Sequence, residues 1–382
     1  MNKSLSRFYI GIITIFLTYF ISDLYSQTRV RSEIYIPNID NYLTLKCDFH
    51  MHTVFSDGYV WPTIRAEEAW RQGLDAIAIT DHIEYQPHKR DIPSNHNRSA
   101  EIAAEEGQLL DILVIKGSEI TRSMPPGHLN AIFIEDAEKL KTDTWREAIK
   151  AASDQKAFIF WNHPGWKGQQ SDGVSRWYPE HTEILEKGML HGIEVVNEKE
   201  YYPEVHRWCL EKNLTMMSNS DIHNPIQMEY DMPHGEYRPL TLVFAKERTI
   251  EAIKEALFAQ RTAVYWNNFL IGKREFLEPI FYNSIQIKNP SIALKKDEEK
   301  YIQIKNSSDI DYKLRLNGEV SDLKGQSHLW LYSGKTILYE VKNVDATFKG
   351  EKKVRIPFQV ENLKITPEEV LQVHLDLNVT FE

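Results

Sequence analysis

The sequence is poor in cysteine. Its 382 residues include only Cys47 and Cys209, and both lie in apolar segments. Two isolated thiols do not resemble a zinc knuckle, and their apolar surroundings favour buried free thiols over a disulfide bond. A disulfide-stabilised scaffold and a cysteine-based zinc site are therefore disfavoured.

Basic charge is also scarce. The chain has 45 Lys and Arg against 55 Asp and Glu, which gives a formal net charge of -10. This balance disfavours a long polyanion such as nucleic acid as a partner, although a local metal cluster can still attract a small phosphate. With 42% hydrophobic residues the chain can bury substantial cores, and its length suggests two or three domains.

The N-terminus has the pattern of an export signal. Lys3 and Arg7 precede an apolar stretch, Phe8 to Ile21, and the polar region Ser22 to Gln27 follows. The stretch is short for a membrane-spanning helix, so we expect a signal peptide over residues 1–27. The mature protein would then be periplasmic or secreted, without stable membrane insertion. An uncleaved anchor stays open, and no cysteine near the junction is available to carry a lipid.

Apolar strand-like runs alternate with helix-like segments between about residues 43 and 245. The runs are Leu43 to Phe49, Ala76 to Thr80, Ile112 to Ile115, Leu129 to Ile134, Phe158 to Trp161, Ile193 to Val196, Thr215 to Ser218 and Leu240 to Phe244. Helix-like patterns such as Pro62 to Gln72 and Ser99 to Leu110 lie between them. This alternation indicates parallel strands joined by helical crossovers, and therefore an α/β fold.

Residues that can bind metal ions follow these runs. His50 and His52 are two residues apart, so both imidazoles point to the same side of a strand. Asp57 follows in a polar turn. Further candidates along the chain are His82, Glu119, His128, His163, Asp221 and His223. An active site is built at the carboxyl ends of the strands in a closed α/β barrel. An open sheet would place ligands there too, but no glycine-rich phosphate loop follows the first strand, so the barrel is favoured.

Five motifs together resemble the PHP (polymerase and histidinol phosphatase) domain family. They are His50-Met51-His52 with Ser56-Asp57-Gly58, Thr80-Asp81-His82, Gly117-Ser118-Glu119, Asn162-His163-Pro164 and Ser220-Asp221-Ile222-His223. The resemblance covers about residues 43 to 260, and it implies a distorted seven-stranded (β/α) barrel that holds up to three divalent metal ions. The export signal and the β-rich tail are similar, more narrowly, to exported bacterial PHP-type phosphodiesterases of small organophosphate diesters.

The resemblance also implies how the ligands divide among three ions. The first ion would bind His50, His52, Glu119 and Asp221, the second would bind Glu119, His128 and His163, and the third would bind Asp57, His82 and His223. Many trinuclear members of the family have histidine where Asp57 stands, and its harder oxygen shifts the third site toward manganese or iron. Zinc, manganese and iron all suit a set of imidazoles and carboxylates without thiolate.

The activity implied by the resemblance is that of a metal-dependent phosphoesterase, with a small phosphodiester or phosphomonoester as substrate. A hydroxide between the two metals bridged by Glu119 would attack phosphorus. Asp81 is the expected proton shuttle or orienting partner of a ligand, and Arg122 is the expected clamp on phosphoryl oxygens. A metal-dependent amide or ester hydrolase on the same cluster stays open. So does a non-catalytic metal-binding scaffold, although nine competent ligand positions disfavour it.

The pattern changes after residue 260. Residues 261–279 are expected to form a connector packed on the barrel, which completes a hydrolase domain over residues 28–279. Short alternating segments, separated by turn signals such as Asn317-Gly318 and Ser333-Gly334, predict an antiparallel β-sandwich over residues 280–382. No ligand-like cluster occurs in this region, so we expect it to be structural or to support a homo-oligomer.

Overall fold

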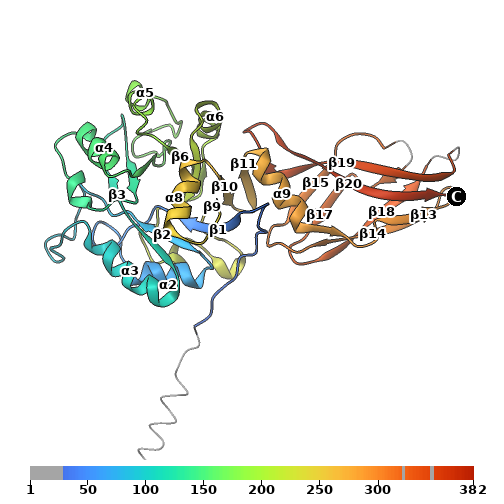
Figure 1. Ribbon diagram of the computed structural model, residues 1–382, viewed down its shortest axis with the longest axis horizontal. Coiled ribbons are helices and arrows are strands. Elements are labelled where there is room, and N and C mark those ends of the chain that lie inside the picture. The colour runs from blue at the N-terminus through green and yellow to red at the C-terminus, as the bar shows by residue number, and fades with distance from the viewer. Residues whose placement is uncertain (1–28, 321–322, 345–347) are drawn as a thin grey trace, which may run out of the picture. The chain divides into compact units, whose positions relative to one another are not determined.

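The computed structural model describes residues 29–320, 323–344 and 348–382. The expected signal peptide, residues 1–27, lies outside this range. Residues 33–382 form one compact unit, in which a mixed α/β part precedes a β domain (Figure 1). Among the described residues, no helix combines the length and the apolar character needed to cross a membrane.

Three parallel strands open the α/β part, as the sequence predicted. They are β1 (Leu43–Asp48), β2 (Ala76–Ile79) and β3 (Leu113–Ile120), with helices α2 (Pro62–Arg71) and α3 (Arg98–Leu110) as the crossovers between them. All residues of β2 are buried, as is usual for a parallel strand covered by helices. Figure 1 shows α2 and α3 side by side on the outside of these strands.

The next strand, β4 (Leu129–Ile132), runs antiparallel, so the prediction of parallel strands throughout is wrong here. It pairs with β3, where Glu119 lies opposite Asn130, and with β5 (Phe158–Trp161) on its other side. The link between β3 and β4, residues 121–128, contains no helix, so the chain turns back instead of crossing over. The start of β4 therefore lies at the same edge of the sheet as the end of β3.

Parallel order returns in β5, β6 (Gly192–Asn197) and β8 (Thr215–Asn219). The other elements of this region are η1 (Ala137–Leu140), α4 (Trp145–Asp154), α5 (Pro179–Glu186), β7 (Glu200–Tyr201), α6 (Pro203–Lys212), α7 (Ile226–Glu229) and η2 (Met232–His234). Local sequence explains where the longer helices begin. Thr144 and Glu147 form a capping box at the start of α4, and α5 and α6 each begin with a proline, whose fixed φ suits a first turn.

Side-chain hydrogen bonds link the two ends of this strand order. β9 (Leu240–Ala245) pairs antiparallel with β1, at the opposite end of the order from β8. The Oγ1 atom of Thr241 in β9 accepts from the backbone N of Ser218 in β8 and donates to its carbonyl, both at 2.9 Å. Helix α8 (Ile250–Phe258) follows and contacts β9. The parallel-rich sheet is thus curved until its ends meet.

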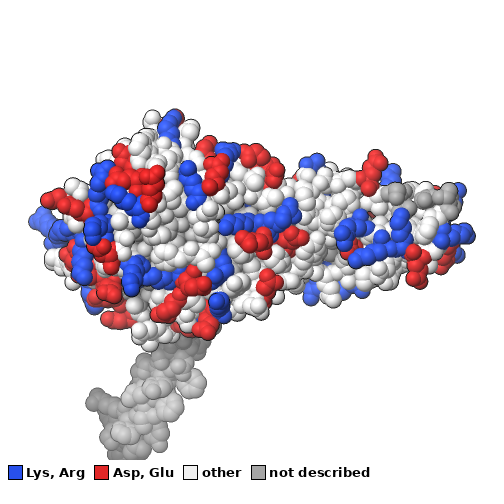
Figure 2. Space-filling model, turned by 45° about the horizontal axis from the view of Figure 1, so that its top comes forward, with Lys and Arg blue, Asp and Glu red and all other residues white. Residues whose placement is uncertain are grey.

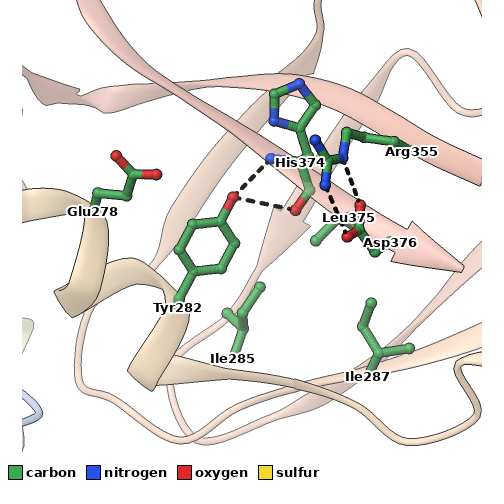
Figure 3. Close-up of a pocket in the computed structure, with 8 residues that line it drawn as sticks. All are labelled: Glu278, Tyr282, Ile285, Ile287, Arg355, His374, Leu375 and Asp376. Carbon is green, nitrogen blue, oxygen red and sulfur yellow. Dashed lines mark hydrogen bonds and ion pairs between the residues drawn. The ribbon is translucent and has the colours of Figure 1, made fainter.

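The predicted connector is a strand hairpin followed by a helix. β10 (Thr262–Trp266) and β11 (Phe269–Gly272) extend the sheet beyond β9, and α9 (Arg274–Ser284) comes next. Near the end of α9, the Tyr282 hydroxyl accepts from the backbone N of His374 at 3.0 Å and donates to its carbonyl at 3.4 Å (Figure 3). These bonds fix the helix to a strand of the β domain.

The β domain consists mainly of antiparallel strands in two sheets. The strands are β12 (Ile285–Ile287), β13 (Ser291–Leu294), β14 (Glu299–Asn306), β15 (Tyr312–Leu316), β16 (Leu323–Gly325), β17 (His328–Leu331), β18 (Thr336–Asn343), β19 (Gly350–Lys364) and β20 (Val370–Phe381). One sheet has the order β12-β14-β18-β16, and β19 pairs with β20 in the other. Alternate residues are buried, among them Ile302, Tyr339 and Phe358.

A parallel pairing joins the β domain to the sheet of the α/β part. Leu270 of β11 lies opposite Leu363 of β19, and Ile271 lies opposite Lys364. Leu270 and Leu363 also belong to one buried apolar cluster, which continues through Phe276 of α9 into the core of the β domain. The α/β part and the β domain, which begins at β12, therefore share a backbone ladder and an apolar core.

Candidate metal centre

The nine predicted metal ligands meet at one edge of the sheet in the α/β part. Those in the segments after parallel strands are His50, His52, Asp57, His82, His163, Asp221 and His223. Glu119 is the penultimate residue of β3. His128 instead precedes β4, and it reaches the same edge because β4 runs in the opposite direction.

The ligand atoms form four overlapping groups, and within each group they all lie within 4.8 Å of one another. The groups are His52-Asp57-His82-His223, His50-Glu119-His163, His50-His52-Asp221 and His82-Glu119-His128. The structure thus brings all nine predicted residues into one cluster. Which ion each of them binds stays a prediction.

Glu119 lies between two sets of imidazoles. Its Oε1 atom is 2.8 Å from His128 Nδ1 and 3.5 Å from His163 Nε2. Its Oε2 atom is 3.4 Å from His50 Nε2 and 3.3 Å from His52 Nε2. His82 Nδ1 lies closer still to Oε2, at 2.9 Å. The carboxylate is buried, and its two oxygens face different sets of ring nitrogens, two at Oε1 and three at Oε2. This is the arrangement that a carboxylate bridging two metal ions requires.

Asp57 is the centre of a second convergence. Its Oδ1 atom lies 3.4 Å from His82 Nε2, 3.3 Å from His223 Nε2 and 3.7 Å from His52 Nδ1. The Nδ1 atom of His223 is 2.7 Å from the carbonyl oxygen of Asp221, to which it can donate. That bond would leave Nε2 unprotonated and directed at Asp57, as a metal ligand needs.

Glu194 of β6 is a site residue that the sequence analysis missed. It is fully buried, and its Oε1 atom accepts from Asn219 Nδ2 at 3.0 Å and lies 2.9 Å from His50 Nδ1. Its Oε2 atom accepts from the backbone N of His163 and from Asn197 Nδ2, both at 2.8 Å. A proton on His50 Nδ1 would leave Nε2 free for a metal. The available signal was a charged residue inside an apolar strand run.

Arg65 of α2 was also missed. It is fully buried, and its guanidinium donates to the carbonyls of His52, Ile222, His223 and Asn224 at 2.8 to 3.0 Å. One side chain therefore ties together the two loops that carry His52 and His223. No sequence pattern marks this role, because the arginine lies in an ordinary helical segment.

Three residues near the site adopt left-handed backbone conformations that are uncommon for residues other than glycine. His163 has a φ of 30°, Glu198 of 50° and Asp221 of 52°. Such conformations cost energy and persist where surrounding contacts enforce them, which happens most often at functional sites. Here they turn the chain sharply just after β5, β6 and β8.

The close packing of imidazoles and carboxylates shifts their pKa values in opposite directions. Burial favours the neutral ring of His82, but Glu119 and Asp57 outweigh it and raise the pKa of His82 to about 10. The same balance, with Asp57 as the main partner, raises the pKa of His223 to about 9. Burial opposes ionisation of Glu119 and Asp57, yet neighbouring imidazoles hold both pKa values below the usual range. The charge on each imidazole or carboxylate in the cluster therefore depends on the charges of its neighbours.

His52 differs from these two histidines. Burial and the positive charges of His223 and His82 lower the pKa of His52 to about 4. Its ring is thus neutral at pH 7, and its Nε2 atom lies 3.1 Å from His50 Nε2. One proton cannot satisfy both of these nitrogens and the surrounding carboxylate oxygens, whereas a cation can.

The residues present fit divalent metal ions. Asp57 Oδ1 and His128 Nδ1 are buried and make no hydrogen bond of suitable geometry, although imidazole or carboxylate atoms of the cluster lie 2.8 to 3.4 Å away. Buried polar atoms usually make well-directed hydrogen bonds, so two atoms in one cluster that lack them point to a bound cation. Imidazole and carboxylate ligands suit zinc, manganese and iron.

Asp81 contacts the loop that carries two ligands. Its Oδ1 atom accepts from the backbone N of Thr53 at 2.7 Å and from Ser56 Oγ at 2.6 Å, and its Oδ2 atom accepts from Thr53 Oγ1 at 2.7 Å. These bonds hold the segment between His52 and Asp57. A role as proton shuttle stays a prediction.

Arg122 is engaged on the protein itself. Its guanidinium pairs with Glu84 at 2.8 Å and donates to the carbonyls of Thr142 at 2.8 Å and Asp143 at 3.2 Å. Its Nε atom is buried and has no hydrogen-bond partner. A role as phosphoryl clamp stays a prediction, and it would require the side chain to exchange some of these contacts.

Comparison with known proteins identifies a full-length relative of known structure. A solved two-domain protein from Bacteroides vulgatus ATCC 8482, described as containing a predicted PHP-like metal-dependent phosphoesterase, is 44% identical to this chain, with a TM-score of 0.87. The match covers 92% of this chain and 100% of that chain. Residues 285–376 match the model of an Ig-like domain family.

A curated relative matches a shorter segment. The uncharacterized protein MJ1295 from Methanocaldococcus jannaschii is 40% identical over 84 residues, which are 22% of this chain and 36% of that protein. The chain thus spans about a third of the length of this relative. Because the expected ligand pattern is assembled at one site and a 44% identical relative is matched over its whole length, the chain belongs to the PHP-like metal-dependent phosphoesterases.

Proposed function

We propose that the protein hydrolyses small-molecule phosphodiesters or phosphomonoesters with the help of up to three divalent ions, bound at the rim of a distorted seven-stranded barrel. Its family and its candidate ligand groups support a metal-dependent phosphoesterase in general. The finer proposal depends on one observation. Glu119 directs its two oxygens at two separate sets of imidazoles, as a carboxylate that bridges two catalytic metals would.

Divalent ions bound at this site would supply a hydroxide nucleophile at neutral pH and would offset the charge of the phosphoryl group. The protein's own residues keep the ligands in place for this chemistry. Asn162 Nδ2 donates to Glu119 Oε1 at 3.0 Å, and Glu194 can fix the ring of His50. Asp57, with His82 and His223, provides a further ligand group beside the bridged pair. No side-chain nucleophile is needed.

Two alternatives make different predictions. An amide or carboxyl-ester hydrolase on the same cluster would hydrolyse amides or carboxyl esters faster than phosphate esters. A non-catalytic scaffold would bind metal and turn over neither class. The intact set of nine ligand residues supports the enzyme over the scaffold, since loss of one or two ligands would be expected in a protein that no longer catalyses.

The first test combines metal analysis with a substrate panel. Purified protein loaded with zinc, manganese or iron is assayed against phosphodiesters, phosphomonoesters and carboxyl esters. Glu119→Gln should nearly abolish phosphate-ester turnover and reduce metal content, with circular dichroism unchanged. Glu186→Gln, an exposed change on α5, is the matched control and should behave as wild type. Wild-type activity in Glu119→Gln would end the proposal.

Labelled water tests the position of attack. Hydrolysis in ¹⁸O-water should place the label on the released phosphate, because the proposed reaction breaks a phosphorus–oxygen bond. Label found only in the released alcohol would mean that carbon is attacked instead.

We further propose export to the periplasm or the medium and a small molecule, not a long nucleic acid, as the substrate. On the face drawn in Figure 2, Lys and Arg are interspersed with Asp and Glu, which supports this choice because nucleic-acid binding uses a continuous basic surface. Intact-mass measurement of exported protein should give a chain that starts near residue 27 or 28. A mass that includes Met1 would refute the cleaved signal.

A further inference from the structure

Trp166 contacts the metal centre and is also open to solvent. Its indole centroid lies 5.4 Å from the ring of His163 and 5.8 Å from the ring of His128. Nearly half of its surface, 48%, is nevertheless exposed. A large aromatic side chain that is half exposed beside two candidate ligands is in a position to touch whatever those ligands bind.

Core packing does not explain this tryptophan as it explains its neighbour Trp161. Trp161 is fully buried, stacked on His181 at 3.7 Å and on Trp208 at 6.0 Å. Trp166 instead packs against the backbone at Gly168, where a β-carbon would come within 2.5 Å of indole atoms. The ring is thus supported by the protein, while a large part of its surface remains available for a ligand.

Tyr85 occupies a comparable position at the other end of a chain of ring contacts. Its ring lies 6.0 Å from His82, the ring of His82 lies 5.9 Å from His128, and His128 contacts Trp166. Tyr85 is 53% exposed. Two exposed aromatic rings, carried by the loops after β2 and β5, therefore border the same group of candidate ligands.

We propose that Trp166, together with Tyr85, forms an aromatic subsite that selects phosphate esters whose organic group presents a flat aromatic or heteroaromatic face. This inference rests on the proposed phosphoesterase function and specifies its substrate class. When the phosphoryl oxygens are held at the ligand cluster, the organic group has to leave the cluster past its border. There it meets aromatic faces, which bind planar rings better than short alkyl groups.

The test uses two diesters with the same leaving group. Phenyl 4-nitrophenyl phosphate and methyl 4-nitrophenyl phosphate both release 4-nitrophenolate, so the ratio of their kcat/KM values isolates the retained group. We expect Trp166→Leu to lower the phenyl-to-methyl ratio about tenfold, which corresponds to about 1.4 kcal/mol. Trp166→Phe should restore most of the ratio. Trp330→Leu is the matched control, because Trp330 is similarly exposed but lies on β17 of the β domain.

Binding provides a second readout. Calorimetric titration of the metal-loaded protein with phenylphosphonate and methylphosphonate should show a phenyl preference that Trp166→Leu removes. If Trp166→Leu does not fold, Tyr85→Leu supplies the same test with a fall in the same direction. A ratio that changes less than about threefold in an active, folded variant would overturn the subsite. Wild-type protein that hydrolyses neither diester would instead overturn the proposed function, and the subsite with it.

Discussion

Replacement of Glu194 by glutamine tests whether a residue away from the metals controls the centre. The wild-type carboxylate meets four nitrogens: its Oε1 faces His50 Nδ1 and Asn219 Nδ2, and its Oε2 faces His163 N and Asn197 Nδ2. Glutamine keeps one oxygen and replaces the other with an amide nitrogen. In either orientation, the glutamine amide N–H group then faces two of these four nitrogens, and the hydrogen bonds that the carboxylate accepted from them are lost.

The size of the effect follows from burial. Glu194 is fully buried, so water cannot replace the lost bonds. Two lost bonds to a charged acceptor should reduce the free energy of unfolding of the metal-free protein by about 3 to 6 kcal/mol. Loss of an outer partner of a metal-bound histidine typically weakens metal affinity by about 10- to 100-fold. We expect both effects, because the bond to His50 Nδ1 is one of those at risk.

Two measurements check this expectation. Urea unfolding of the metal-free protein gives the stability change, and competition with a chromophoric chelator gives the metal affinity. Glu186→Gln on the surface of α5 serves as the control and should change stability by less than about 0.5 kcal/mol. If Glu194→Gln matched that control in both measurements, Glu194 would not orient the ligands and the argument from its hydrogen bonds would be wrong.

Three further predictions concern the ligands and the β domain. Asp57→Asn should weaken the ligand group it shares with His82 and His223 and lower activity, while metal analysis still finds the ions that we propose Glu119 to bridge; loss of every ion would contradict this. His82 and His223 have raised pKa values of about 10 and 9. In the metal-free protein they therefore stabilise the fold fully below pH 6.5, about the pKa of histidine in the unfolded chain, and this stabilisation is lost as the pH rises through 9 to 10. Metal must displace these protons, so titration at pH 7 should release protons and metal affinity should rise toward pH 9; affinity that is independent of pH would refute the shifts. Removal of residues 285–382 should lower solubility because the apolar cluster is shared, but any folded fraction should retain metal, since every candidate ligand group among the described residues lies upstream.

The sequence allowed the ligands to be predicted because their chemistry is local. An imidazole or carboxylate just after an apolar run is visible in the chain, and the strand ends of an α/β fold bring such residues together. The spacing of His50 and His52 even indicates that they share a face. Assembly of Asp57 with His223, 166 positions apart, was inferred only through the resemblance to a family.

Other features depend on contacts that no local pattern reports. The partners of Glu194 include His50, which is 144 positions away along the chain. Arg65 holds carbonyls about 158 positions away, and backbone carbonyls carry no sequence signal. The reversal of β4 depends on the short link before it, which the alternation of apolar runs did not reveal. The placement of His128 at the site follows from that reversal.

The parallel pairing of β11 with β19 determines how the two parts of the protein should unfold. Separating Leu270 from Leu363 breaks a backbone ladder and also opens the apolar cluster on both sides of it. Neither part can lose its structure without exposing surface of the other, which couples their unfolding. Heating should therefore give one cooperative transition, in which the amides of the α/β sheet and of the β domain become exchangeable with solvent together.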